Sequence, residues 1–396
     1  IYIFMSEQRM TARHWMALIG LACAAFIFNT SEFVPIGLLS DIGADFSRTE
    51  AETGMLISVY AWMVMLLSLP LTMLFSRMEM RKLLLGVMGC FTLFQGLSFL
   101  SSSYWMLMLA RIGVAGTHAI FWSIIPSIAV HTVPPSRRSL ALSVVVTGTS
   151  IAVIMGMPLG RAIGLLVGWR MTFLCIGIFA LLTLIFVTAT LPAIPAGKGV
   201  SLHGLPVMLR KKVLTGIYVF TLLFATGYYT AYSYIEPFLK QIGGMQDSLI
   251  TGTLMVFGAA GLVSSVAFSK LYATRRFSFV TMAMCGLTLV LVLVRPLAFS
   301  HVLSIALCAV WGISVTAYNL AMQSEVISAA SEDESAVAMS IYSGIFNLGI
   351  GCGALIGGGV CTHLSLSWVG AVGAVLAGAG LLYWLLRLRP LMAGRG

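Results

Sequence analysis

Long apolar stretches follow one another along almost the whole chain, separated by short polar segments. Twelve of them are long enough to cross a bilayer as helices, which takes about 20 residues each. They cover residues 14–38, 52–76, 82–101, 104–131, 139–166, 170–191, 213–238, 248–271, 277–297, 300–328, 336–361 and 365–388. A β-barrel would show short alternating segments instead. The sequence therefore predicts an all-α membrane protein with twelve transmembrane helices.

The composition agrees with this pattern. Of the residues, 59% are hydrophobic and only 9% are charged, whereas soluble domains average about 25% charged residues. The first span is not expected to be a cleaved signal peptide, because it contains Glu32 and Pro35 and lacks a small-residue cleavage site after a short apolar core.

The net charge of +10 is distributed unevenly over the connecting segments. With the N-terminus inside, the cytoplasmic segments hold Arg9, Arg13, Arg77, Arg81, Lys82, Arg137, Arg138, Lys198, Arg210, Lys211, Lys212, Lys270, Arg275, Arg276, Arg387, Arg389 and Arg395. The opposite side holds Arg48, Arg161, Arg170, Lys240 and Arg295. This bias predicts that both termini are cytoplasmic, and the acidic segment 331–335 changes little because acidic residues count little in the rule. A lipid bilayer, and not a nucleic acid, is therefore the expected partner of these charges.

A polar segment at residues 192–212 divides the spans into two sets of six, and a short surface helix is expected at 201–209. The run 75–77 recurs as 268–270, and the first span of each set ends with an acid and a proline. Two related halves predict a binding cavity between them near the bilayer midplane. The predicted organisation is a cytoplasmic segment 1–13, a six-helix half 14–191, the linker 192–212, a second six-helix half 213–388 and a cytoplasmic tail 389–396.

Glu32 is a carboxylate inside the first span. Placing it in hydrocarbon costs about 2.5–3.5 kcal/mol, so it must face a wet cavity, pair with a cation or carry a proton. Asn29 lies three residues earlier and shares its helical face. We therefore expect an amide and a carboxylate that point together into the cavity.

Arg111, His118 and Trp122 share one face of the fourth span, at i, i+7 and i+11. Arg111 is interpreted either as a fixed cation that stabilises a nearby carboxylate such as Glu32, or as a side chain that partly snorkels to the interface. A lone buried histidine is more often a hydrogen-bonded structural group than a proton carrier. The titration range of His118 nevertheless suits a pH-gated step.

The seventh span places Tyr228, Tyr232 and Glu236 four residues apart. Aromatic rings with hydroxyls suit a polyhydroxylated or amphipathic ligand. The alternative is an interfacial aromatic belt, which fits Tyr234 best because it lies near the outer end. Glu236 lies closer still to that end and is interpreted either as a ligand contact or as a solvated helix-terminal acid.

Other polar side chains fall at depth in the predicted spans. Asn319 and Gln323 lie one turn apart in the tenth span, and Asn347 lies in the eleventh. Each is predicted either to line the cavity or to join helices by hydrogen bonds. Tyr60, in the second span, is a further candidate for the cavity wall.

The fifth span contains Gly156, Pro158 and Gly160. Small residues allow helices to approach closely, and a proline removes a backbone donor and bends the helix. Such a kinked helix suits two halves that rock against each other, so these residues are candidates for gating.

No metal site or cofactor is indicated. The seven cysteines lie in apolar spans without a Cys-x-x-Cys pair and are expected to be buried hydrophobes. No nucleophile–base pair points to an enzyme. A non-transporting receptor or scaffold would need neither an intramembrane acid–arginine–histidine set nor kinked helices at corresponding positions.

Three motifs resemble the major facilitator superfamily, and within it the twelve-helix drug–proton antiporters. The stretch from Gly148 to Gly160 resembles the antiporter signature of helix five, and Arg111 with Gly116 resembles a helix-four motif whose arginine is implicated in proton coupling. The run 168–173 resembles the group's entry into helix six. The resemblance implies two pseudo-symmetric six-helix halves.

Four longer runs resemble the bacterial sugar efflux transporters: 28–35, 118–123, 229–238 and 343–347. This resemblance implies proton-coupled export of arabinose-like sugars and thiogalactosides by alternating access, with proton coupling as the role of Glu32 and Arg111. His118 competes with Glu32 for the same proton. The resemblance also implies a monomer in the bacterial inner membrane. A multidrug antiporter for lipophilic, drug-like compounds is the alternative.

One loop departs from the superfamily pattern. Residues 76–82 keep the basic Arg77 and Arg81 but lack the usual glycines and aspartate. We expect Glu79 to take the place of the aspartate in a charge network that braces the cytoplasmic gate.

Overall fold

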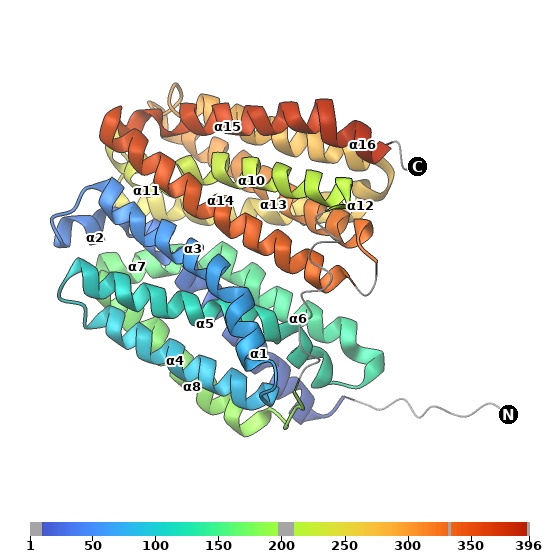
Figure 1. The fold of residues 1–396 in the computed structure, drawn as a ribbon. Coiled ribbons are helices and arrows are strands. Elements are labelled where there is room, and N and C mark those ends of the chain that lie inside the picture. The colour runs from blue at the N-terminus through green and yellow to red at the C-terminus, as the bar shows by residue number, and fades with distance from the viewer. Residues whose placement is uncertain (1–9, 197–209, 332–333, 394–396) are drawn as a thin grey trace. The chain divides into compact units, whose positions relative to one another are not determined.

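The computed structural model describes residues 10–196, 210–331 and 334–393, and these residues form helices and connecting loops without a strand (Figure 1). The predicted surface helix at 201–209 lies outside the described residues, as does most of the predicted segment 1–13. Within the described part, eleven helices are long and apolar enough to cross a membrane.

The elements before the linker, in chain order, are α1 (Ala12–Gly37), α2 (Leu39–Asp45), α3 (Glu50–Phe75), α4 (Met80–Phe99), α5 (Tyr104–His131), α6 (Arg138–Ile151), the π-helix η2 (Ala152–Gly156), α7 (Met157–Val167) and α8 (Trp169–Thr190). Those after it are α10 (Lys212–Tyr232), α11 (Ile235–Pro237), the π-helix η4 (Phe238–Ile242), α12 (Asp247–Leu293), α13 (His301–Ala329), α14 (Ser335–His363), α15 (Val369–Tyr383), the π-helix η6 (Trp384–Leu388) and α16 (Arg389–Ala393). Two short 3₁₀ turns, η1 (Pro135–Arg137) and η5 (Leu366–Trp368), precede α6 and α15.

The difference between eleven long helices and twelve predicted spans lies in α12. This helix is 47 residues long, and Arg275 inside it has non-helical backbone angles, with φ −134° and ψ 37°. The predicted spans 248–271 and 277–297 are thus two helices joined through a kink rather than a loop. The predicted fold class is confirmed.

Two compact units share these helices. The first contains the described parts of Ile1–Phe33, Leu67–Gly156 and Arg170–Val200, and the second contains those of Val34–Leu66, Met157–Trp169 and Ser201–Gly396. The second unit therefore holds segments from both predicted halves of the sequence. The division into related halves at 192–212 stays a prediction.

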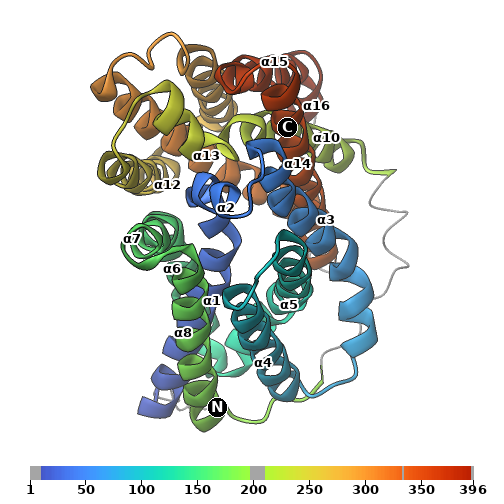
Figure 2. The ribbon, with the colours of Figure 1, turned by 90° about the vertical axis from the view of Figure 1, so that its left-hand side faces the viewer.

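An aromatic stack fixes α1 in the first unit. The ring of Phe28 lies 4.1 Å from that of Phe91 on α4 and 4.0 Å from that of Phe121 on α5, measured between centroids. Figure 2 shows α4 and α5 side by side, and the two helices pack along their length. Because Glu32 follows Phe28 by one turn, the stack sets the position of its carboxylate beside α5.

In the second unit, α10 packs against both α14 and α15 (Figure 1). Gly227 makes the contact with α15 possible, because a Cβ atom there would lie 2.7 Å from the backbone nitrogen of Ala377. Next to this contact, the ring of Phe224 stacks on Tyr318 of α13 with a centroid distance of 3.4 Å. Small residues thus bring the helices together, and aromatic rings fill the remaining space.

The fifth span changes from a π-helix to an α-helix beside its proline. The π-helix η2 ends at Gly156, and α7 begins at the next residue with Pro158 in its first turn. π-Bulges and prolines are both established causes of helix bends. A Cβ atom on Gly156 would lie 2.3 Å from Oγ1 of Thr30, so close contact with α1 requires a glycine here.

Candidate functional site

Glu32 and His118 meet in the first unit. Oε2 of Glu32 lies 3.6 Å from Nε2 of His118, and the two side chains are only 14% and 5% exposed. Trp122, one turn further along α5, covers the imidazole with a ring-centroid distance of 6.0 Å. The three residues therefore form a nearly dry carboxylate–imidazole contact.

Arg111 is held beside this contact. It is 1% exposed, and its guanidinium donates to the backbone carbonyls of Ser31 at 2.8 Å and Glu32 at 3.4 Å. The Ser31 hydroxyl lies 3.4 Å from the same guanidinium and also accepts from Gln95 Nε2 at 2.5 Å. The snorkelling interpretation of Arg111 is wrong, because the side chain is buried within the protein. Arg111 is therefore a fixed cation next to Glu32.

Asn29, the predicted neighbour of Glu32, is 7% exposed. Its Oδ1 atom has no hydrogen-bond partner among the described residues. A buried acceptor left without a partner is costly, so Asn29 has the chemistry of a ligand contact. The role itself stays a prediction.

The tyrosines of the seventh span lie in an aromatic cluster of the second unit. Tyr228 and Tyr232 are 4.8 Å apart between ring centroids, and Tyr232 stacks on Phe257 at 4.8 Å. Trp311 of α13 closes the cluster at 6.1 Å and 5.9 Å from the two tyrosine rings. Sequence analysis missed Trp311, since nothing local distinguishes it from a packing residue.

The interfacial-belt alternative is wrong for Tyr234. This side chain is 0% exposed, and its hydroxyl donates to the backbone carbonyl of Ala354 at 2.8 Å. It joins α14 to the end of α10 instead of marking a membrane surface.

The predicted amides bond within their own helices. Nδ2 of Asn319 donates to Val315, and Nδ2 of Asn347 donates to Ser343, each to the carbonyl four residues earlier. Oδ1 of Asn347 has no hydrogen-bond partner in the part of the chain that is described. Gln323 is exposed and Tyr60 is buried. Cavity-lining roles for these four stay predictions.

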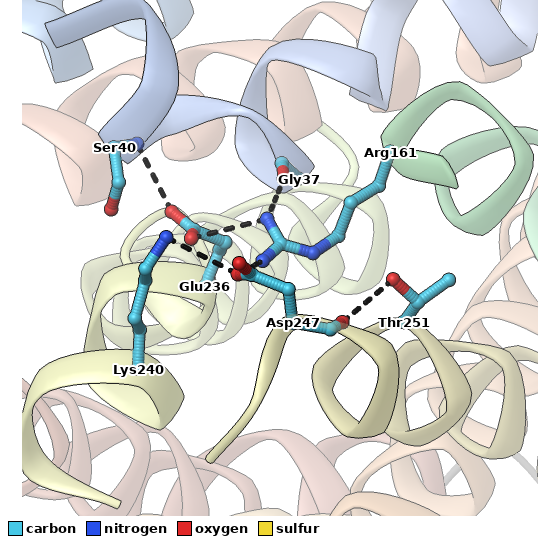
Figure 3. A network of polar contacts seen from close by, with 7 residues as sticks. All are labelled: Gly37, Ser40, Arg161, Glu236, Lys240, Asp247 and Thr251. Carbon is cyan, nitrogen blue, oxygen red and sulfur yellow. Dashed lines mark hydrogen bonds and ion pairs between the residues drawn. The ribbon is translucent and has the colours of Figure 1, made fainter. Parts of the chain in front are cut away.

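Glu236 is not a solvated helix-terminal acid. Its side chain is 0% exposed, and Oε1 lies 3.1 Å from Nη1 of Arg161, which is also 0% exposed. Oε2 accepts from the backbone N–H of Ser40 at 3.0 Å. Figure 3 shows Arg161 of α7 pointing at the carboxylate from across the group. The sequence did offer a signal for Arg161, because it falls inside the predicted span 139–166 and not in a loop.

The chain matches the family model described as Major Facilitator Superfamily over residues 21–342. The chain belongs to this superfamily. The match confirms that part of the resemblance, and the protein is a membrane transporter of the superfamily type, which disfavours a receptor or scaffold. The antiporter group and the sugar efflux subfamily stay predictions.

Solved structures of transporters share the fold of this superfamily member. A bacterial homolog of the human lysosomal transporter Spinster gives a TM-score of 0.77 at 16% identity, covering 96% of this chain and 98% of that one. The nucleoside transporter NupG gives 0.76 at 13% identity, with 94% and 98% covered. The human organic anion transporter TETRAN gives 0.69 at 14% identity, with 95% and 100% covered.

The loop after α3 shows which contacts its charged residues make in this superfamily member. Oε2 of Glu79 lies 3.4 Å from Nζ of Lys82, and Nη2 of Arg81 donates to the backbone carbonyl of Thr188 on α8 at 2.8 Å. Arg77 is exposed. The Arg81 bond ties α4 to α8, whereas the Glu79–Lys82 pair is local to the start of α4. The gating roles of Arg77, Glu79 and Arg81 stay predictions.

Another buried acid lies near the kink of α12. Glu325 of α13 is 6% exposed and accepts a 2.6 Å hydrogen bond from the hydroxyl of Tyr272, with Arg276 3.9 Å away. It braces the two arms of α12 against α13. Among residues 10–196, 210–331 and 334–393, no three His, Cys, Asp or Glu side chains gather closely enough to hold a metal ion.

Proposed function

We propose that the protein exports small neutral sugars in exchange for protons, by alternating access. The observation that carries the proposal is the contact between Glu32 and His118, 3.6 Å apart and nearly excluded from solvent. The Arg111 guanidinium compensates the charged form of an acid placed there, and when the acid is protonated the guanidinium is still held by the backbone carbonyls of the same turn.

The proposed cycle has two protonation states of Glu32. The charged carboxylate, stabilised by Arg111 and by the imidazole of His118, belongs to the state that takes up substrate from the cytoplasm. A proton from outside neutralises Glu32 after substrate release, and the neutral site returns. The proton drives this cycle only because the two conformations bind it with different affinity.

The second unit supports a neutral, hydroxyl-rich substrate. Its aromatic cluster around Tyr228 and Tyr232 offers flat apolar faces of the kind that stack on sugar rings. Buried polar atoms of the second unit without a hydrogen-bond partner among the described residues include Nε1 of Trp311, the Tyr342 hydroxyl and Oδ1 of Asn347. All three groups are uncharged, so they suit hydroxyls better than an ion.

The proposed location is the bacterial inner membrane, with both termini in the cytoplasm and one chain acting as a monomer. The bias of lysine and arginine toward the segments assigned to the cytoplasm supports this orientation.

Efflux from proteoliposomes with an imposed pH gradient tests the proposal. The purified protein is given either a radiolabelled pentose or a lipophilic cation, and each is followed with and without the gradient. We expect gradient-driven efflux of the pentose. Efflux of the cation alone would replace the sugar proposal with multidrug transport, and efflux that ignores the gradient would remove the proton from the mechanism.

A further inference from the structure

Four charged side chains form a network inside the second unit (Figure 3). Arg161 contacts Glu236 at 3.1 Å and Asp247 at 2.7 Å, and Lys240 also contacts Asp247 at 3.2 Å. Nη1 of Arg161 further donates to the backbone carbonyl of Gly37 at 2.5 Å. We call this group, with the Ser40 N–H that binds Glu236, the Arg161 network.

The Arg161 network joins segments that are far apart in the sequence. Gly37, Ser40 and Arg161 come from α1, α2 and α7, before the linker. Glu236, Lys240 and Asp247 come from α11, η4 and the first residue of α12, after it. In the topology predicted from the lysine and arginine bias, all of these positions lie at the outer ends of their spans.

The network has a dry core and a wet rim. The side chains of Arg161 and Glu236 are 0% exposed, whereas Lys240 and Asp247 are 36% and 41% exposed. A buried ion pair is weak evidence for stability, since apolar side chains of similar volume often do as well. An ion pair has a different advantage: its charged side chains become hydrated when the surface opens to water. Apolar side chains packed in the same place could be exposed only at a cost in free energy.

Some contacts of the network lie within one half of the chain and would remain if the two halves separated. Arg161 would still bind the Gly37 carbonyl, and Asp247 would still pair with Lys240. Three contacts cross between the halves: Arg161–Glu236, Arg161–Asp247 and Ser40–Glu236. Both partners of Glu236 come from the other half, so Glu236 is the group that water must solvate once these contacts break.

We propose that the Arg161 network is an outer latch, which holds α2 and α7 against α11 and α12 in one state of the transport cycle and comes apart in the other. The proposal rests on alternating access in the proposed function. Position 40 offers a reporter, because Ser40 binds Glu236 through its backbone N–H. Ser40→Cys therefore keeps this backbone hydrogen bond.

The test is labelling of Ser40→Cys by a membrane-impermeant maleimide in right-side-out and inside-out vesicles, with the unsubstituted protein giving the background of the native cysteines. Adding Arg161→Gln is expected to raise labelling from outside by about tenfold or more, because local opening becomes easier. Arg48→Gln is the matched control, because Arg48 forms an exposed ion pair with Glu52, with side chains 37% and 45% exposed. It should leave labelling unchanged.

Two outcomes overturn the latch: labelling that Arg161→Gln leaves unchanged, or an equal rise with Arg48→Gln. If Arg161→Gln does not fold, Arg161→Gln/Glu236→Gln, which leaves no unpaired buried charge, carries the same test. Labelling needs neither substrate nor a gradient. If labelling rises but the protein transports no pentose, the proposed substrate is contradicted and the latch is supported. If labelling is unchanged but pentose is exported, the latch is contradicted and the proposed substrate is supported.

Discussion

Arg161 and Glu236 form an ion pair in which both side chains are completely buried, with Nη1 3.1 Å from Oε1. They come from opposite sides of the linker, so no local pattern in the sequence pairs them. Leaving one buried charge without its partner typically costs about 3–5 kcal/mol. We therefore expect the loss of this ion pair to be the main cause of any change in stability when either residue is substituted.

Arg161→Ala is expected to lower the free energy of unfolding by about 3–5 kcal/mol, because it leaves the buried Glu236 carboxylate without its ion-pair partner. The double substitution Arg161→Met/Glu236→Leu should recover most of that loss, since it leaves no buried charge. Thermal unfolding of the purified proteins in one detergent measures both. A double variant as unstable as the single one would show that the backbone contacts of Arg161 matter more than its charge.

Glu32→Gln is expected to reduce gradient-driven efflux to background while substrate binding persists. The amide keeps the size of the carboxylate but cannot release a proton. Efflux and equilibrium binding are measured on the same preparation. Full gradient-driven efflux from this variant would remove Glu32 from proton coupling.

His118→Gln separates the imidazole from the carboxylate. If Glu32 carries the proton and His118 orients it, the variant should slow efflux but keep its dependence on the pH gradient. Efflux is followed at several gradients, with Glu32→Gln beside it. Loss of the gradient dependence in His118→Gln, with the dependence kept in Glu32→Gln, would assign the proton to histidine.

Gly227→Ala is expected to destabilise the protein by about 1–3 kcal/mol, as overpacking usually does. The added Cβ would lie 2.7 Å from the backbone nitrogen of Ala377, and backbone cannot move aside as a side chain can. Gly359→Ala is the control, because a Cβ there meets nothing within 4 Å. The unfolding temperature of Gly227→Ala should lie well below those of the control and of the unsubstituted protein.

Glu334, outside the membrane-spanning segments, gives a prediction about pH. A 2.5 Å hydrogen bond from Lys211, followed by bonds from Ser331, lowers the pKa of this carboxyl to about 2. A lowered pKa means a stabilising contribution that is complete above the ordinary value of about 4.3 and is lost as the pH falls toward 2. Lys211→Gln should therefore lower the unfolding temperature slightly and by a constant amount from pH 8 to 5. A difference that grows below pH 4 would contradict this assignment.

The sequence predicted the features that depend on position within one helix. Glu32, Arg111 and His118 were found because a charge in an apolar span is conspicuous and because helical spacing aligns them. Arg111 was expected to act on the Glu32 carboxylate by its charge, whereas its hydrogen bonds to the backbone carbonyls of Ser31 and Glu32 were not predicted. Such a detail depends on the side-chain rotamer and the depth of the helix, which spacing does not encode.

Features that depend on two distant segments escaped prediction. Arg161 was counted among the outer charges, and neither Trp311 nor Glu325 drew attention, although the first closes the aromatic cluster and the second accepts from Tyr272. Each of these roles comes from a partner on another helix. One sequence without a structure gives no means of choosing that partner.

The kink of α12 bears on how the chain reaches the bilayer during synthesis. Across 47 residues only Arg275 leaves the helical region, so the two spans are joined without an intervening loop. Lys270, Arg275 and Arg276 lie at this turn, and cationic residues near span ends favour retention in the cytoplasm. The two spans should therefore enter the lipid together as one hairpin, with the arginines at its tip deciding its direction.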